Sequence, residues 1–177
     1  MKGFVLAGGA STRFGSEKAL HPVDGVAMAL RVVRALEGAG LDVQLVVRNR
    51  DLAELGPSLL HEPPSPGHHP LQGVHAALQS LEPGECGFFA PCDMPWLRSD
   101  GVRALLAARA PAVASDGKRI HPLLCQVPWE WRARVEEALR QGGAVRELFS
   151  GVTQVVLEPA QLANINRVED LKSVPPI

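Results

Sequence analysis

A glycine-rich segment with two basic residues is the part of this sequence best suited to chemistry. Gly8 and Gly9 follow a short apolar run, and Arg13 and Lys18 come a few positions later. Small residues let a phosphate approach the backbone, so N–H groups and both cations could bind it together. The spacing fits neither a Walker loop nor GxGxxG. We therefore expect an anion-binding loop; the alternative is a glycine-rich connection with two solvated basic side chains.

An acidic residue follows a second apolar run. Asp93 stands in the sequence Pro-Cys-Asp-Met-Pro directly after the run 87–90. A carboxylate at the carboxyl end of a central strand faces the same crevice as the glycine-rich segment, and such oxygen ligands hold Mg²⁺ against substrate phosphates. Asp93 is therefore our candidate metal ligand, although an Asp near a Pro can also cap a turn.

Two asparagines near the end of the chain form the third candidate. Asn164 and Asn166 alternate in an expected extended segment, so their side chains project to one face. One could ligate the metal opposite Asp93 while the other braces the loop, and we take Asn166 as the ligand. An N-cap or an Asx turn would explain the same spacing. His121 could contact a second substrate, but a lone histidine is more often structural.

The elements that must position these residues alternate between strands and helices. Apolar runs predict strands at 4–7, 43–47, 59–60, 87–90, 112–114, 121–127 and 152–157, and helical spacing predicts helices at 27–39, 71–81, 102–109, 129–140 and 168–171. This alternation predicts a Rossmann-like three-layer α/β/α fold with a mainly parallel central sheet and ligands at the carboxyl ends of its strands. The Pro-rich stretch 63–70 is then an active-site loop rather than a domain boundary.

Length and composition limit the class of protein. A chain of 177 residues with 46% hydrophobic and 21% charged residues is typical of one globular domain, here residues 1–177. The net charge of −1 excludes a broad electrostatic footprint for nucleic acid. No apolar run reaches the ~18 residues of a membrane span, and no signal peptide is recognisable, so we expect a cytoplasmic protein. Three cysteines without CxxC spacing are expected to be reduced.

Taken together, these motifs resemble the molybdenum cofactor guanylyltransferases of the MobA type, within the nucleotidyltransferase family of Rossmann-like folds. The segment from Leu6 to Lys18 is similar to the family signature LAGGxSxRMGxDK. Further similar motifs follow in family order and cover nearly the whole chain: Pro70–Gly73, Pro91–Pro95, Asp116–Gly117 with His121–Pro122, and Asn164–Leu171. Jointly these motifs are specific, whereas each alone is not.

The resemblance implies a nucleotide-diphospho-sugar transferase-like fold and an Mg²⁺-dependent nucleotidyltransferase. Its implied reaction moves GMP from GTP to the phosphate of Mo-molybdopterin, giving the molybdopterin guanine dinucleotide cofactor and pyrophosphate. Other molybdenum cofactor proteins are implied as partners. Carried over by position, the resemblance implies nucleotide contacts at Leu6, Ala7, Gly8 and Gly9, phosphate contacts at Arg13 and Lys18, and Mg²⁺ at Asp93. It also implies a nucleotide contact at Glu62, where the family has an Asp.

Three other functions remain open at this point. A molybdopterin cytidylyltransferase and a sugar- or isoprenoid-phosphate nucleotidyltransferase would share much of the same machinery. Gly8 and Gly9 favour the guanylyl subgroup, because cytidylyl relatives tend to carry LAAG. A non-catalytic GTP-binding module would be expected to show a Walker lysine and a switch segment, and neither is visible in the sequence.

Overall fold

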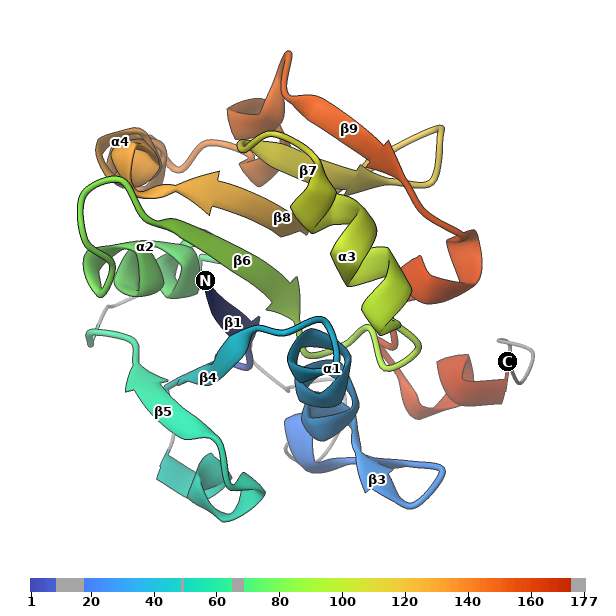
Figure 1. Cartoon of the computed structure of the whole chain (residues 1–177). Coiled ribbons are helices and arrows are strands. Elements are labelled where there is room, and N and C mark those ends of the chain that lie inside the picture. The colour runs from blue at the N-terminus through green and yellow to red at the C-terminus, as the bar shows by residue number, and fades with distance from the viewer. Residues whose placement is uncertain (9–17, 49, 65–68, 173–177) are drawn as a thin grey trace.

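A seven-stranded sheet runs through the centre of the molecule (Figure 1). The computed structural model describes residues 1–8, 18–48, 50–64 and 69–172. The strands lie in the order β5-β4-β1-β6-β8-β7-β9. Their bounds are β1 Lys2–Leu6, β4 Asp42–Val47, β5 Ser58–His61, β6 Cys86–Pro91, β7 Ala112–Ser115, β8 Ile120–Pro128 and β9 Thr153–Val156. Strand β8 is antiparallel to both of its neighbours and the other pairs are parallel, so the sheet is mainly parallel, as predicted.

Four α-helices among the described residues cover the two faces of this sheet. They are α1 Met28–Glu37, α2 Leu71–Gln79, α3 Ser99–Ala107 and α4 Arg132–Gln141. Helices α1 and α3 pack on the face that presents Val5, Leu45 and Phe88. Helices α2 and α4 pack on the opposite face, which presents Phe4, Val46 and Phe89. Neighbouring strand residues point to opposite faces, so continuous apolar runs are needed in strands buried on both sides. The predicted three-layer α/β/α arrangement is confirmed.

Some element boundaries differ from the prediction. Helix α3 begins three residues before the expected position 102. The expected helix 129–140 divides into a 3₁₀ turn, η3 Trp129–Trp131, and α4, while the expected helix 168–171 is a 3₁₀ turn, η6 Val168–Lys172. Further 3₁₀ turns are η1 Lys18–Leu20, η2 Arg50–Leu55, η4 Val145–Phe149 and η5 Pro159–Leu162. Such turns are short connectors whose side-chain pattern resembles the start of a helix.

The prediction missed a small hairpin just after Lys18. Strands β2, Pro22–Val23, and β3, Val26–Ala27, pair antiparallel around Asp24 and Gly25. Both turn residues have positive φ, 49° and 77°, as a type I′ turn requires. The Asp-Gly pair is a hairpin signal, but each strand has only two residues, so no alternating pattern accompanies it.

The carboxyl ends of the parallel strands meet at one edge of the sheet. Leu6 of β1 is in register with Val46 of β4 and with Pro91 of β6, so these three strands end together. Strands β7 and β9 run in the same direction as β6, and the antiparallel β8 therefore begins where they end. The segments that follow β1, β6, β7 and β9 consequently gather at this edge.

Two further observations concern the chain as a whole. The three cysteines form no disulfide among the described residues: Cys125 is buried, and Cys86 and Cys92 are partly buried. Among the described residues, none of the helices has the length and apolar character needed to cross a lipid bilayer.

Candidate functional site

An ion pair between Lys18 and Asp93 stands at the carboxyl edge of the sheet. Lys18 begins η1, and Asp93 lies two residues after the end of β6. The Lys18 Nζ atom donates to Asp93 Oδ2 over 2.9 Å, with the two side chains 16% and 19% exposed. Residues 75 positions apart in the sequence are thus in direct contact, and partial burial reduces the solvent screening of their charges. The structure brings these two predicted site residues together.

The asparagine segment lies against this ion pair. Lys18 Nζ also donates to Asn166 Oδ1 over 3.2 Å, and the backbone N–H of Ile165 donates to the Asp93 carbonyl over 2.9 Å. The Asp170 carboxylate accepts the N–H groups of Asn166 and Arg167 at 2.7 and 2.8 Å, and these bonds lower the pKa of Asp170. Asp170 therefore fixes the backbone that presents the Asn166 amide to Lys18.

One carboxylate oxygen in this cluster still lacks a partner. Asp93 Oδ1 is buried and accepts no hydrogen bond from the described residues. A buried acceptor without a donor is costly, and a hard cation is one way to satisfy it. Mg²⁺ is commonly held by one or two carboxylates together with substrate phosphates, so the donor set of Asp93 and Asn166 fits this ion. The described residues contain no cluster of three or more His, Cys, Asp and Glu side chains arranged to hold a metal.

Glu62 lies beneath the start of the glycine-rich segment. Its side chain is 6% exposed, and its Oε2 accepts from Arg48 Nε over 2.5 Å. A Cβ atom added to Gly8 would stand 2.1 Å from Glu62 Oε1, and one added to Gly73 would stand 3.0 Å from the same atom. The carboxylate is therefore paired with Arg48 and packed between two glycines, one after β1 and one in the first turn of α2.

Leu6 and Ala7, two of the nucleotide-binding candidates, form backbone hydrogen bonds that continue the pairing of β1 at its carboxyl end. Ala7 N donates to the Val46 carbonyl over 2.8 Å, and the Leu6 carbonyl accepts from Cys92 N over 3.1 Å. These bonds fix the exit of β1 beside the Asp93 loop. The candidates Gly9 and Arg13 lie outside the described residues.

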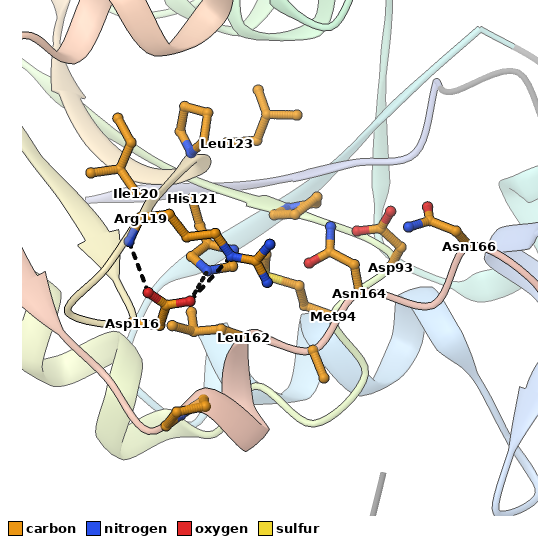
Figure 2. Close-up of a pocket in the computed structure, with 14 residues that line it drawn as sticks. Asp93, Met94, Asp116, Arg119, Ile120, His121, Leu123, Leu162, Asn164 and Asn166 are labelled. Atoms are coloured by element: carbon orange, nitrogen blue, oxygen red, sulfur yellow. Dashed lines mark hydrogen bonds and ion pairs between the residues drawn. The ribbon is translucent and has the colours of Figure 1, made fainter. Parts of the chain in front are cut away.

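A cleft of about 600 Å³ opens on the other side of Asp93 (Figure 2). Asp93, Asn164 and Asn166 line one side of it, and the turn between β7 and β8 lines the other. Figure 2 shows the Arg119 side chain reaching from this turn toward Asn164 and Asp93. The volume of the cleft lies within the range of small-molecule sites, ~300–1,000 Å³. The cleft can therefore hold a ligand of drug size next to the ion pair.

Asp116 organises the turn that carries Arg119. Its Oδ1 accepts the backbone N–H groups of Lys118 and Arg119, both at 2.9 Å, and its Oδ2 accepts from Arg119 Nε over 3.1 Å. These donors lower the pKa of Asp116 to about 2. Sequence reasoning noted Asp116 only through the family resemblance and missed Arg119. The Asp-Gly turn directly after a strand was the signal that could have found it.

His121 borders the same cleft as a largely buried side chain. It is 10% exposed, and its Nε2 lies 3.8 Å from Asp116 Oδ2, too far for a hydrogen bond. Burial lowers the pKa of His121, and the charge of Arg119 lowers it further, while Asp116 opposes both. The imidazole is therefore kept neutral near pH 7 and lines the cleft without adding charge.

Comparison with known proteins finds relatives that are similar in sequence and in fold. Residues 3–157 match the family described as the MobA-like NTP transferase domain. A probable molybdenum cofactor guanylyltransferase of Bacillus licheniformis is 30% identical, and the alignment covers 97% of this chain and 95% of that one. The molybdenum cofactor guanylyltransferase of Cupriavidus metallidurans is also 30% identical, with 96% and 91% covered. The structure of molybdopterin-guanine dinucleotide biosynthesis protein A from Archaeoglobus fulgidus is similar in fold, with a TM-score of 0.76, 22% identity, and 98% and 96% covered.

Proposed function

The chain belongs to the MobA-like NTP transferase family, an enzyme family of nucleotidyltransferases, and we propose that it transfers GMP from GTP to the phosphate of Mo-molybdopterin. The products are the molybdopterin guanine dinucleotide cofactor and pyrophosphate. The observation that carries the proposal is the Lys18–Asp93 pair with the unpartnered Asp93 Oδ1 beside a cleft of about 600 Å³. The guanylyl assignment is supported by relatives of that name that align with nearly the whole chain.

The reaction needs charge compensation more than proton transfer. An oxygen of the acceptor phosphate attacks the α-phosphorus of GTP while the bond from that phosphorus to the oxygen of the leaving pyrophosphate breaks. The attacking phosphate is already an anion, so no general base is required, and the difficulty lies in aligning two polyanions. Bound Mg²⁺, held by Asp93 and Asn166, would supply electrostatic stabilisation of the phosphates.

Different described residues are placed to bind each of the two substrates. Lys18 stands between Asp93 and Asn166, where its ammonium group can bind the phosphates of GTP and stabilise charge on the leaving group. Arg119 and Asn164 border the cleft and can bind the acceptor phosphate. Arg13 is proposed as a second cation for the triphosphate, because its position matches the family signature.

The first experiment identifies the product. The purified chain is given Mo-molybdopterin, Mg²⁺ and an equimolar mixture of GTP and CTP, and the dinucleotide formed is identified by mass spectrometry. The guanine dinucleotide is expected in large excess. A cytosine dinucleotide would make the chain a cytidylyltransferase, and GTP binding without pyrophosphate release would favour a non-catalytic module.

A second experiment tests the role of Asp93. Asp93→Ala is expected to lower turnover by at least about 100-fold, because it removes the proposed metal ligand and the partner of Lys18. The matched control is Asp42→Asn, an exposed carboxylate at the start of β4 and hence at the opposite edge of the sheet. Turnover and thermal unfolding are measured for both variants. Near-normal turnover by a folded Asp93→Ala variant would remove Asp93 from the mechanism.

A further inference from the structure

An apolar junction outside the cleft connects the segments that carry the site residues. Lys18 and Asp93 lie on different segments, and neither segment belongs to the sheet. A small apolar cluster of Val23, Met28, Trp96 and Ile165 joins the β2–β3 hairpin, helix α1, the loop after Asp93 and the asparagine segment. Trp96 is three residues from Asp93, and Ile165 adjoins Asn166. Movement at this junction would therefore displace Lys18, Asp93 and Asn166 relative to one another.

Arg31 of α1 is the polar part of this junction. Its Nε donates to the carbonyl of Pro95 over 2.9 Å, and its Nη1 donates to the carbonyl of Val23 over 3.2 Å. Pro95 lies two residues after Asp93, and Val23 lies five residues after Lys18. One guanidinium group thus connects the hairpin that follows Lys18 to the loop that carries Asp93.

The fork geometry of arginine accounts for the residue type. Several N–H groups in a rigid plane allow a single side chain to reach two carbonyl groups at fixed positions, which the point charge of lysine cannot reproduce. Nη1 also lies 3.1 Å from Asp24 Oδ2, but that carboxylate is 79% exposed. An exposed pair of this kind contributes little. The two backbone carbonyls are therefore the partners that matter.

We propose that Arg31 is a positioning residue for phosphoryl chemistry at this site, acting on Lys18 and Asp93 without touching substrate. The inference rests on the proposed nucleotidyl transfer and adds a residue that the family signature does not include. Small displacements of aligned groups are costly, since a shift of ~1 Å can reduce the rate by ~100-fold. Loss of the two carbonyl bonds of Arg31, which we call the Arg31 clamp, should therefore lower kcat more than it raises the KM for GTP.

Helix α1 offers a matched control one turn away. Arg34 is exposed, lies on the same helix and borders the same shallow groove of about 360 Å³ as Arg31. Its side chain donates no hydrogen bond within the described part of the chain. Arg31→Ala and Arg34→Ala therefore remove the same charge and the same side chain from one helix, and they differ in the two carbonyl bonds, in the exposed contact with Asp24 and in side-chain burial.

The kinetic test compares the wild-type chain with Arg31→Ala, Arg31→Lys and Arg34→Ala. Arg31→Ala is expected to lower kcat by about 10- to 100-fold with less than a threefold change in the KM for GTP. Arg31→Lys should recover part of this loss, and millimolar guanidinium should raise the rate of Arg31→Ala several-fold. Arg34→Ala should stay within twofold of wild type and show no response to guanidinium. Equal kcat values for Arg31→Ala and Arg34→Ala would overturn the proposal.

A second readout does not depend on activity. Amide hydrogen exchange should speed up in residues 20–27 and 94–98 of Arg31→Ala, and also of Arg31→Lys should the alanine variant fail to fold. The strands of the sheet should be unchanged, as should every segment of Arg34→Ala. If the wild-type chain transfers no GMP, the proposed function fails while this exchange experiment still tests the clamp. Unchanged exchange in both segments would refute the clamp itself.

Discussion

At the scale of single residues, Glu62 shows how one carboxylate restricts the size of the side chains beside it. The family resemblance implies that an Asp is usual at this position, and the longer Glu brings its carboxylate against Gly8, Gly73 and Arg48. Gly8 has no positive φ that would itself require glycine. Its small size is therefore needed for space, because a β-carbon would overlap Glu62 Oε1. The sequence predicted a carboxylate near the nucleotide loop but could not show that this carboxylate is paired and buried.

This packing predicts a coupling between Gly8 and Glu62. Gly8→Ala is expected to lower the free energy of unfolding by about 1–3 kcal/mol, as overpacking does, because the added methyl group must displace the Glu62 carboxylate. The cost should be smaller when the same change is made in a Glu62→Ala background. Urea unfolding of the two single variants and the double variant measures the coupling.

Gly143 provides the control for this prediction. A Cβ atom at Gly143 would come no closer than 3.8 Å to another atom, and this residue also lacks a positive φ. Gly143→Ala should therefore change the free energy of unfolding by no more than about 1 kcal/mol. An equal cost for Gly8→Ala with and without the Glu62 side chain would show that the glycine serves some purpose other than space.

At the scale of elements, the predicted strands and four of the five predicted helices are present, and most of the differences lie at their ends. The ends depend on contacts between distant residues that periodicity does not record. Helix α3 is an example, because Gln126 of β8 donates to the carbonyls of Leu105 and Ala108 over 2.9 and 2.5 Å. The last carbonyls of a helix have no partner within it, so a buried side chain from another element can define where it ends.

Gln126 is accordingly expected to matter for stability and not for turnover. It is 1% exposed, and replacing it with leucine removes the donor to the Ala108 carbonyl and one of the two donors to the Leu105 carbonyl, which also accepts from Ala108 N. Gln126→Leu should lower the free energy of unfolding by about 1–3 kcal/mol, measured by urea denaturation, with kcat preserved. Gln79→Leu, on the exposed end of α2, is the control and should be nearly neutral. Equal effects of the two changes would contradict this account.

At the scale of the whole molecule, the direction of β8 decides what lies beside Asp93. The sequence predicted the strand itself, but an apolar run is buried equally well in either direction. The short gap between the predicted strands 112–114 and 121–127 indicates the direction of β8, because a parallel pair needs a crossover of a dozen or more residues. A short turn permits only the antiparallel arrangement. That arrangement brings Arg119 and His121 to the edge where β6 ends.

Placing His121 at this edge also makes the stability of the whole molecule depend on pH. Burial and the charge of Arg119 lower the pKa of His121 below its ordinary value of 6.5 in the folded chain. Asp116, with a pKa of about 2, stays ionised between pH 5 and 7 and adds no slope there. In that range the His121 side chain is protonated to a greater extent in the unfolded chain than in the folded chain. Protonation therefore favours unfolding as the pH falls below about 6.5.

We therefore expect the free energy of unfolding to decrease from pH 7 to pH 5, with His121 contributing up to about 1.4 kcal/mol per pH unit. His121→Gln should remove this contribution and flatten the profile, because glutamine carries no titrating group. His61, an exposed histidine at the end of β5, is the control, and His61→Gln should leave the slope of the wild-type chain intact. Urea denaturation at half-unit pH steps gives the three profiles. A slope that persists in His121→Gln would assign the acid sensitivity to other groups, whereas a slope lost in both variants would show that burial beside Arg119 is not its cause.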